Sequence, residues 1–206
     1  MATGGVKLEA VVLAAGAGTR FGGRKLTAPW REGVLLDSAL AAAFSAPVRS
    51  VTVVTGADGA VEAAARGFAE RSAQTARLRI VHCPDHAEGM GATLRTGVAS
   101  LPPDADGVFV FLGDMPLIPP AILPKLAEAL AAGAPAAAPT FEGKRGHPVL
   151  FSRAFFPELL SVTRDEGARQ VLRGLGDALA LVASPNDGVL VDVDERGDLD
   201  RGLGSH

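Results

Sequence analysis

Short apolar runs rich in β-branched residues alternate along this chain with longer stretches of helix-forming composition. The apolar runs, each of strand length, cover residues 9–13, 51–55, 78–81, 108–112, 148–151 and 188–193. The helix-forming stretches cover residues 35–44, 59–71, 92–100, 120–132 and 167–172. Because strands that alternate with helices are joined by crossover connections, this order predicts an α/β fold with a mainly parallel sheet and helices on both faces.

The length of the chain and its apolar content predict a single domain. Its 206 residues are 48% hydrophobic, which is enough to bury a full core, and its charges are spread rather than blocked. The Ala- and Pro-rich stretch 131–139 is too short to separate two stable domains, so we interpret it as a helix end followed by a short strand. We therefore expect one domain over residues 1–206.

Charge and cysteine content argue against several classes of protein. The formal net charge of -3 provides no basic field of the kind that non-specific nucleic-acid binding requires, so we expect no nucleic-acid partner. Cys83 is the only cysteine, which excludes an intrachain disulfide. The chain shows no secretion signal and no apolar run of membrane-spanning length. We expect a cytoplasmic protein with no membrane partner.

A glycine-rich loop with two cations follows the first predicted strand. Gly16 and Gly18 lie at the start of this loop, and Arg20 and Lys25 follow. Glycines let backbone N–H groups turn toward an anion, and the two cations would neutralise charge that those dipoles leave. The loop therefore predicts a phosphate cradle, and the alternative is a tight turn without a ligand.

Two well-known glycine motifs do not fit this loop. A dinucleotide fingerprint that begins at Gly16 and Gly18 would need glycine or alanine at position 21, which is Phe21. A P-loop that begins at Gly18 reaches Gly23, but Arg24 follows where the motif requires lysine. These mismatches disfavour an NAD-binding oxidoreductase and a P-loop enzyme.

Aspartates follow two of the predicted strands. Asp114 comes directly after the strongly apolar run 108–112, so its carboxylate should emerge at the same sheet edge as the glycine-rich loop. Asp192 and Asp194 lie at the end of the last predicted strand, where residues two apart share a face. Because Mg²⁺ is commonly held by one or two carboxylates together with substrate phosphates, this pattern predicts a magnesium site. The alternatives are a helix cap at Asp114 and a solvated strand end at the other two.

Six segments in order along the chain resemble the motifs of one family. They are LAAGAGTR at 13–20 with Lys25, GMGATL at 89–94, GDMP at 113–116, RGHP at 145–148, DEGAR at 165–169 and VDVD at 191–194. Together they resemble the MobA-like NTP transferases, and within them the molybdenum-cofactor nucleotidyltransferases. The resemblance implies a Rossmann-like, doubly wound three-layer sandwich of the nucleoside-diphospho-sugar transferase type, with a nucleotide-binding half at about 8–115 and an acceptor-binding half at about 116–200.

The resemblance also implies roles for individual residues. Arg20, Lys25 and Asp114 would be the catalytic set, the two cations holding the triphosphate and Asp114 holding Mg²⁺, with Asp192 or Asp194 completing the metal site. The implied nucleotide pocket adds Leu13, Ala14, Ala15, Gly16, Gly18, Thr19, Gly91 and Thr93. His147 and Arg169 are the implied acceptor-binding residues.

The activity implied by the resemblance is Mg²⁺-dependent transfer of a nucleotide from an NTP to a phosphorylated small molecule, with release of pyrophosphate. Ala15 in the LAAG opening favours CTP over GTP, because guanylyl-type members tend to carry LAGG. Molybdopterin or its molybdate-loaded form is the leading acceptor, and a molybdoenzyme or its maturation factor is a further partner. The alternatives are a sugar phosphate or other phosphorylated metabolite as acceptor, and a non-catalytic carrier of the molybdenum cofactor.

The chain departs from the family pattern after the last motif and in and after the glycine-rich loop. After the last motif the family usually continues Thr-Pro-Glu-Asp-Leu, but residues 195–199 are Glu-Arg-Gly-Asp-Leu, which puts the terminal helix in doubt. Phe21 stands where the family more often has Met, and residues 27–30 also differ. We interpret the changes at 21 and 27–30 as variation in packing.

Some polar residues have a structural interpretation beside the functional one. The residues His82, Cys83, Asp85 and His86 lie close together but match no zinc-binding pattern. His147 either forms part of a turn before Pro148 or contacts the acceptor. Arg169 either binds an anionic acceptor or pairs with Glu166 one helical turn earlier.

Overall fold

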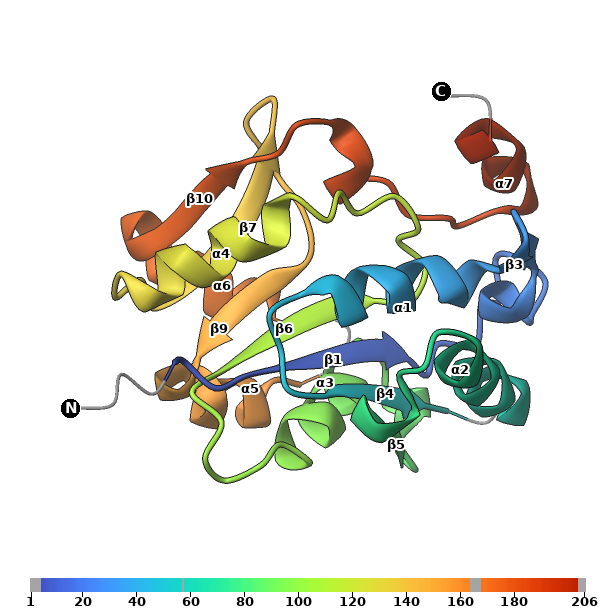
Figure 1. The fold of residues 1–206 in the computed structure, drawn as a ribbon, viewed down its shortest axis with the longest axis horizontal. Coiled ribbons are helices and arrows are strands. Elements are labelled where there is room, and N and C mark those ends of the chain that lie inside the picture. Colours follow the sequence, from blue (N-terminus) through green and yellow to red (C-terminus); the bar gives the residue numbers. More distant parts are fainter. Residues whose placement is uncertain (1–4, 57, 164–167, 204–206) are drawn as a thin grey trace.

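A central sheet runs through the computed structural model, which describes residues 5–56, 58–163 and 168–203 (Figure 1). Its strands are β1 (Leu8–Ala14), β4 (Val51–Thr55), β5 (Leu78–His82), β6 (Gly107–Leu112), β7 (Ala136–Phe141), β8 (Lys144–Arg145), β9 (Val149–Ser152) and β10 (Leu179–Ala183). A separate hairpin consists of β2 (Pro29–Trp30) and β3 (Gly33–Val34).

The strand order of the sheet is β10-β7-β9-β6-β1-β4-β5, with β8 paired to β7. β1 lies between β4 and β6 and is parallel to both, whereas β9 is antiparallel to its neighbours β6 and β7. The parallel strands β6, β1, β4 and β5 therefore bring their carboxyl ends to one edge of the sheet. This mainly parallel α/β arrangement confirms the predicted fold class.

Helices cover both faces of the sheet. One face carries α1 (Leu35–Ser45), α2 (Gly59–Arg71) and α4 (Ile122–Ala131), and the other carries α3 (Met90–Ala99), α5 (Phe156–Ser161) and α6 (Arg169–Leu175) (Figure 1). The start of α2 shows why a helix begins there, because the side chain of Asp58 accepts a hydrogen bond of 3.0 Å from the backbone N–H of Ala60.

The core is divided by the sheet into two clusters, as strand alternation requires. Val11 of β1 packs into the cluster that includes α3, whereas its neighbour Val12 packs into the cluster that includes α1 and α2, and both are fully buried. Gly97 lets α3 lie close to β1, because a Cβ added there would be 2.5 Å from a methyl carbon of Val11. Burial of one such valine contributes roughly 1.5 kcal/mol.

Most predicted elements match observed ones. The predicted strands at 9–13, 51–55, 78–81, 108–112 and 148–151 correspond to β1, β4, β5, β6 and β9, and the five predicted helices correspond to α1, α2, α3, α4 and α6. The stretch 131–139 is the end of α4 and the start of β7, as predicted. Residue 167, where the fifth predicted helix begins, lies outside the described residues. The hairpin, β8, β10 and α5 were not predicted, and α7 (Arg196–Leu203) is the terminal helix that the altered residues 195–199 put in doubt.

The predicted strand at 188–193 is wrong. Asp187–Val189 form a 3-10 turn, and the residues that follow pair with no strand of the described chain. Asn186 explains the turn, because its side-chain oxygen accepts a hydrogen bond of 3.0 Å from the backbone N–H of Gly188. Asp192 and Asp194 consequently lie on an irregular segment that crosses to α7, rather than on one face of a strand.

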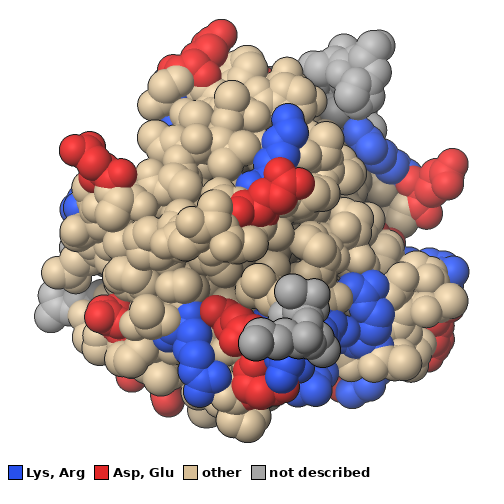
Figure 2. All heavy atoms as spheres, turned by 60° about the vertical axis from the view of Figure 1, so that its left-hand side comes forward, with Lys and Arg blue, Asp and Glu red and all other residues tan. Residues whose placement is uncertain are grey.

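The surface shows no large region of one charge sign on the face in Figure 2, where acidic and basic side chains are interspersed. Within the described parts of the chain, no helix is both long enough and apolar enough to span a membrane.

Candidate functional site

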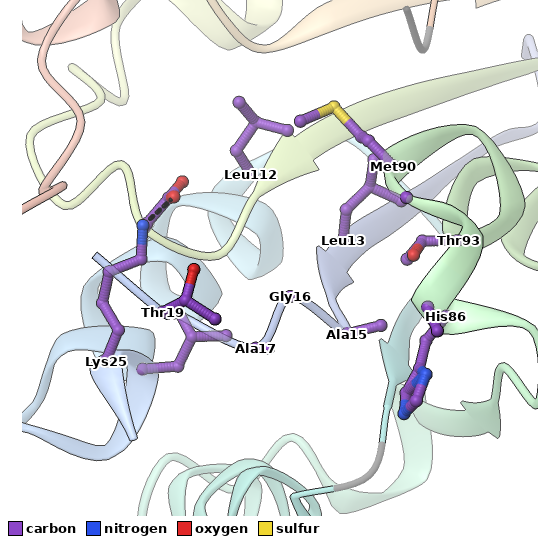
Figure 3. A pocket seen from close by; sticks show the side chains of 15 residues that line it. Leu13, Ala15, Gly16, Ala17, Thr19, Lys25, His86, Met90, Thr93 and Leu112 are labelled. Atoms are coloured by element: carbon purple, nitrogen blue, oxygen red, sulfur yellow. Dashed lines mark hydrogen bonds and ion pairs between the residues drawn. The ribbon is translucent and has the colours of Figure 1, made fainter. Parts of the chain in front are cut away.

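A cavity of about 460 Å³ opens at the edge of the sheet where β1, β4, β5 and β6 end. The loops that follow β1, β5 and β6 supply most of its wall, and the start of α3 supplies the rest (Figure 3). The lining residues are Leu13, Ala15, Gly16, Ala17, Gly18, Thr19, Lys25, Leu26, His86, Ala87, Gly89, Met90, Thr93, Leu112 and Asp114. Ligands of open α/β sheets bind at such an edge, so this cavity is the candidate site.

The glycine-rich loop after β1 folds back on itself. The carbonyl oxygen of Gly18 accepts hydrogen bonds of 3.0 Å from the backbone N–H groups of both Phe21 and Gly23. Gly18, Gly22 and Gly23 all have positive φ angles, of 60°, 88° and 88°. These are conformations that glycine adopts at little cost, so the glycines allow the compact turn.

Three consecutive backbone donors in this loop remain unused. Among the described residues, no acceptor is hydrogen-bonded to the backbone N–H of Ala17, Gly18 or Thr19. All three residues line the cavity. Backbone N–H groups that have no partner in a glycine-rich turn next to a cavity form a suitable cradle for an anion.

A short ion pair lies at one end of the cavity. The Lys25 Nζ atom is 2.6 Å from Oδ2 of Asp114, and the two side chains are only 13% and 23% exposed (Figure 3). The same Nζ atom is 3.6 Å from Oδ1 of Asp194, whose other carboxylate oxygen lies 3.2 Å from Nη1 of Arg20. The ammonium of Lys25 therefore lies between two carboxylates that come from distant parts of the chain.

Asp192 adds a third carboxylate to this region. Burial of its carboxyl group, followed by the negative charges of Asp194 and Asp114, raises the pKa of Asp192 above its ordinary value. The residue as a whole is exposed, and the two neighbouring carboxylates contribute to this rise. Three carboxylates with only two cations beside them favour the binding of a further cation.

The residues around Lys25 suit a divalent cation when phosphates supply the remaining ligands. Within the described residues, no group of three or more His, Cys, Asp and Glu side chains is arranged as a complete metal site. Mg²⁺ does not need one, because it is usually held by one or two carboxylates, substrate phosphates and water. Asp114 and Asp194 already share one cation, the ammonium of Lys25, so this donor set fits.

The segment that carries Asp194 is anchored to the sheet at several points. The backbone N–H of Val193 donates a hydrogen bond of 3.0 Å to the carbonyl oxygen of Asp114. Further back, Gly188 packs so closely that a Cβ there would lie 1.9 Å from the carbonyl oxygen of Leu117. These contacts bring the last motif of the chain to the loop after β6.

The opposite end of the cavity is more apolar. Met90 and Thr93 project from the first turns of α3, and His86 lies on the loop that follows β5 (Figure 3). Nδ1 of His86 is buried and has no hydrogen-bond partner among the described residues. The cavity thus has an ionic end at Lys25 and a less polar end at His86, which suits a ligand with phosphates at one end and a ring at the other.

The two predicted acceptor residues lie outside this cavity. His147 precedes β9, and its backbone N–H donates a hydrogen bond of 2.9 Å to the carbonyl oxygen of Val189. Burial lowers the pKa of His147 to about 4, against the opposing effects of the Val110 backbone and the Asp114 charge, so the imidazole is neutral at pH 7. Arg169 is exposed at the start of α6, and Glu166, its proposed partner, lies outside the described residues.

Eight of the predicted nucleotide-pocket residues line the cavity: Leu13, Ala15, Gly16, Gly18, Thr19, Lys25, Thr93 and Asp114. Ala14 and Gly91 are buried behind its wall, and Arg20 lines a separate hollow of about 210 Å³ next to Asp194. Sequence reasoning missed Ala17, Leu26, His86, Ala87 and Leu112 as wall residues, whereas Gly89 and Met90 belong to the motif at 89–94. The place of His86 in the loop that follows β5 was the signal that could have indicated it.

The residues His82, Cys83 and His86, at the end of β5 and in the loop after it, lie in different surroundings in the structure. Cys83 is fully buried, and the Thr96 hydroxyl contacts its sulfur at 3.2 Å. His82 is exposed and does not line the cavity, in contrast to His86. Cys83 is therefore a residue of the core.

Sequence comparison gives a match over most of the chain. The family model described as the MobA-like NTP transferase domain matches residues 10–180. That range includes the glycine-rich loop, the whole cavity wall and Asp114, and it ends before Asp192 and Asp194.

Two relatives and a solved structure are similar to this chain over more than nine-tenths of its length. The molybdenum cofactor cytidylyltransferase of Escherichia coli (strain K12) is 28% identical over 187 residues, 91% of both chains. The purine catabolism protein PucB of Bacillus subtilis (strain 168) is 31% identical over 192 residues, again 91% of both chains. Rv0371c from Mycobacterium tuberculosis H37Rv is 27% identical and superimposes with a TM-score of 0.79 over 97% of this chain and 99% of its own. Rv0371c has also been solved in complex with manganese.

Proposed function

We propose, from the premise that the chain belongs to the MobA-like NTP transferase family, that it joins a nucleotide to a phosphorylated small molecule with the aid of Mg²⁺. The chain is a nucleotidyltransferase. In the proposed reaction an oxygen of the acceptor phosphate forms a bond to the α-phosphorus of the NTP. The bond between the α- and β-phosphates breaks, and pyrophosphate leaves with the electron pair.

One observation carries this proposal: the ammonium of Lys25 lies between the carboxylates of Asp114 and Asp194, beside a loop with three unused backbone donors. A triphosphate needs donors and cations, whereas a divalent cation needs carboxylates. Both sets line two hollows that share Gly18, Thr19 and Lys25. The reaction requires positioning and charge neutralisation rather than an enzyme nucleophile, so these groups are sufficient.

The cations and carboxylates would exchange partners when substrate binds. In the free protein, Lys25 and Arg20 neutralise Asp114 and Asp194. With a triphosphate in the cavity, we expect the two cations to turn to phosphate oxygens and Asp114, with Asp194 or Asp192, to hold Mg²⁺. When bound there, Mg²⁺ would neutralise charge on the phosphates and on the departing pyrophosphate.

The nucleotide would lie along the cavity between its two ends. The glycine-rich loop with Leu13, Ala14, Ala15, Gly16, Gly18 and Thr19, and the helix start with Gly91 and Thr93, form the proposed nucleotide-binding half at about 8–115. The phosphates belong at the Lys25 end, which leaves the base at the end lined by Thr93 and Met90. CTP is the favoured nucleotide, because of Ala15 and because the relative from E. coli is named a cytidylyltransferase.

The acceptor is proposed to bind in the half at about 116–200. The molybdenum cofactor is the first candidate, because it is the substrate in the name of the relative from E. coli. The relative from B. subtilis is named for purine catabolism, which keeps other phosphorylated acceptors open. His147 and Arg169 are the proposed acceptor-binding residues, and a molybdoenzyme or its maturation factor is a proposed partner.

Thermal stabilisation by nucleotides tests the proposed site. A ligand that binds only the folded state raises the apparent stability by an amount set by its concentration relative to Kd. We expect one of CTP, GTP, ATP and UTP to raise Tm, to need Mg²⁺ for the full effect, and to lose that need in Asp114→Asn. The exposed Asp177→Asn is the matched control. No shift with any triphosphate, or a shift with NADH alone, would show that the site is wrong.

The same variant separates an enzyme from a carrier of the cofactor. A carrier that binds the molybdenum cofactor without turnover should tolerate Asp114→Asn with little loss of cofactor binding. The proposed enzyme should retain part of its nucleotide affinity in that variant and lose the release of pyrophosphate. Assays with molybdenum cofactor and with sugar phosphates as acceptors then identify the acceptor class.

A further inference from the structure

Two departures from the family pattern meet in space. Phe21 lies in the glycine-rich loop, and Arg196 opens α7, 175 positions later in the chain. The guanidinium carbon of Arg196 lies over the Phe21 ring, 5.0 Å from the ring centroid. This distance is within the range of an attractive cation–π contact. The two residues that differ from the family pattern therefore contact each other.

Phe21 is buried in the loop, whereas Arg196 lies at the surface. The Phe21 side chain is only 3% exposed, and its backbone N–H donates to the carbonyl oxygen of Gly18 in the turn of the loop. Arg196 is exposed, so its guanidinium can cover the ring without being desolvated. The contact joins the loop that is proposed to bind phosphates to the first turn of the terminal helix.

The same helix start fixes the backbone of Asp194. Oδ2 of Asp198 accepts hydrogen bonds of 2.9 Å from the backbone N–H of Asp194 and of 2.8 Å from that of Glu195. These are donors that a helix start leaves without internal partners. Asp198 therefore ties the position of the Asp194 backbone to the position of α7.

Apart from its ion pairs with Arg20 and Lys25, the Asp194 side chain has little support among the described residues. Its carboxylate is 47% exposed, and its segment pairs with no strand among the described residues. On one side, Val193 is attached to the carbonyl of Asp114. On the other side, the attachment runs through Asp198 and α7 to the contact of Arg196 with Phe21.

We propose that Arg196, Phe21 and Asp198 form a clasp that positions Asp194 beside Lys25 and Arg20, and so sets how well the site takes up a divalent cation. Arg196 is thus a positioning residue that acts through the backbone of 194–198. The inference rests on the proposed function, because a positioned second carboxylate matters only if a cation binds with the nucleotide. It also explains how the altered sequence at 195–199 still supports the site.

The test is a titration of Mg²⁺ at fixed CTP, read as the rise in Tm, so it needs no turnover. The variants are Arg196→Ala, Arg196→Lys, Phe21→Leu and the double variant Phe21→Leu with Arg196→Ala, and Arg173→Ala on exposed α6 is the control. If CTP itself does not stabilise the natural sequence, another triphosphate that does is used.

The clasp predicts that Arg196→Ala raises the Mg²⁺ concentration for half-maximal stabilisation about two- to fivefold, the range expected for an exposed cation–π contact. Arg196→Lys should recover part of the loss, and Arg196→Ala should have little further effect in the Phe21→Leu background. Stabilisation by CTP without Mg²⁺ should change less. Arg173→Ala should leave the titration unchanged.

Two outcomes would overturn the clasp while leaving the proposed function intact. One is a lower Tm in Arg196→Ala with an unchanged Mg²⁺ midpoint, which would make the contact purely structural. The other is an equal effect of Arg196→Ala with Phe21 and with Leu at position 21, which would show that the pair is not coupled. Absence of any stabilisation by triphosphates and Mg²⁺ in the natural sequence would instead remove the proposed function, and the clasp with it.

Discussion

Two networks of charged residues lie at opposite ends of the strands, and they differ in how fully their members are paired. The amino-end network consists of Lys7, Glu9, Arg49, Ser50 and Asp104. These residues lie at or just before the starts of β1, β4 and β6. The carboxyl-end network consists of Arg20, Lys25, Asp114 and Asp194, at the cavity beyond the ends of the same strands.

The amino-end network is closed. Glu9 has a side chain only 2% exposed, and Oε2 accepts hydrogen bonds from Ser50 N–H at 3.0 Å and from its hydroxyl at 2.6 Å. Its other oxygen, Oε1, is 2.6 Å from Nη2 of Arg49. Hydrogen bonds to Asp104 and then Glu9 raise the pKa of Arg49, and hydrogen bonds from Arg49 and Lys7 lower the pKa of Asp104. Each group already has its partner, which is typical of a structural network.

The carboxyl-end network is open. Its ammonium is shared between two carboxylates, Asp192 adds a third that raises the local negative charge, and the loop beside it has unused N–H donors. Similar ion pairs therefore have different roles, according to which groups around them remain unpaired. A network with surplus groups next to a cavity can exchange its partners for a ligand, whereas a closed one stabilises the fold.

The largest expected effect is loss of turnover in Lys25→Ala. The variant removes the cation nearest to the proposed phosphates, so we expect kcat/KM to fall about 10²- to 10³-fold, or roughly 3–4 kcal/mol of transition-state stabilisation. Although the pair is mostly buried, unfolding free energy should fall by only about 1–2 kcal/mol, because the carboxylate of Asp114 lines the cavity and water can solvate it once Lys25 is removed. Pyrophosphate release and denaturant unfolding measure the two quantities. The exposed Lys125→Ala is the control, and turnover within tenfold of the natural sequence would contradict the assignment.

Glu9→Ala should show the reverse pattern. It leaves the N–H and hydroxyl of Ser50 without their acceptor inside the protein and removes a buried partner of Arg49. We expect unfolding free energy to fall by about 2–4 kcal/mol in denaturant unfolding, with nucleotide affinity unchanged while the protein is folded. Glu62→Ala, which breaks an exposed pair with Arg66, should cost less than about 0.5 kcal/mol. Equal costs for the two variants would remove the distinction between the networks.

The imidazole of His147, whose Nδ1 is buried without a hydrogen-bond partner among the described residues, predicts a loss of stability in acid. Its folded-state pKa of about 4 lies below the ordinary value of 6.5, so between these values the unfolded chain binds a proton that the folded chain does not. Stability is therefore highest above pH 6.5 and falls as the pH drops toward 4, by at most about 3 kcal/mol from this group. His147→Gln should flatten that part of the pH profile of unfolding free energy, and exposed His82→Gln should not. Identical profiles for the two variants would contradict the account.

The smallest effect is expected for Asp194→Asn. In this variant the change in CTP affinity should have opposite signs without and with Mg²⁺. The substitution removes the charge that holds Arg20 and shares Lys25, so both cations become more available to a triphosphate. Without Mg²⁺, we expect CTP to bind about two- to fivefold more tightly than in the natural sequence, since exposed pairs contribute less than about 1 kcal/mol. With Mg²⁺ the variant should bind more weakly than the natural sequence. Weaker binding under both conditions would argue against exchange of partners.

Much of the fold could be predicted because it depends on local pattern. The β-branched runs of β1, β4 and β6 fix strands, and parallel strands bring the loops with Gly18 and Asp114 to one edge. The run at 188–193 misled because its apolar residues resemble a strand, whereas Asn186 and Gly188 impose a turn. The strand β10 (Leu179–Ala183) was missed because only one of its five residues is β-branched.

The residues of the site that lie in loops after strands could be predicted. Lys25 and Asp114 carry their signal in motifs directly after β1 and β6, and the structure brings them to a distance of 2.6 Å. Met90 lies in the motif at 89–94, but which residues of a helix start become part of a wall is decided by packing. The contact of Phe21 with Arg196 depends on the path of the whole chain and could not be predicted from either position alone.

The most direct test of the exchange is the affinity for CTP with and without Mg²⁺, measured by titration calorimetry on the natural sequence and on Asp114→Asn. Such an exchange predicts that Mg²⁺ tightens CTP binding at least about tenfold in the natural sequence, a coupling of about 1.4 kcal/mol. The enhancement should fall below about threefold in Asp114→Asn, because one of the carboxylates that would hold the ion is lost. Equal affinity with and without Mg²⁺, or an enhancement that survives in the variant, would contradict it.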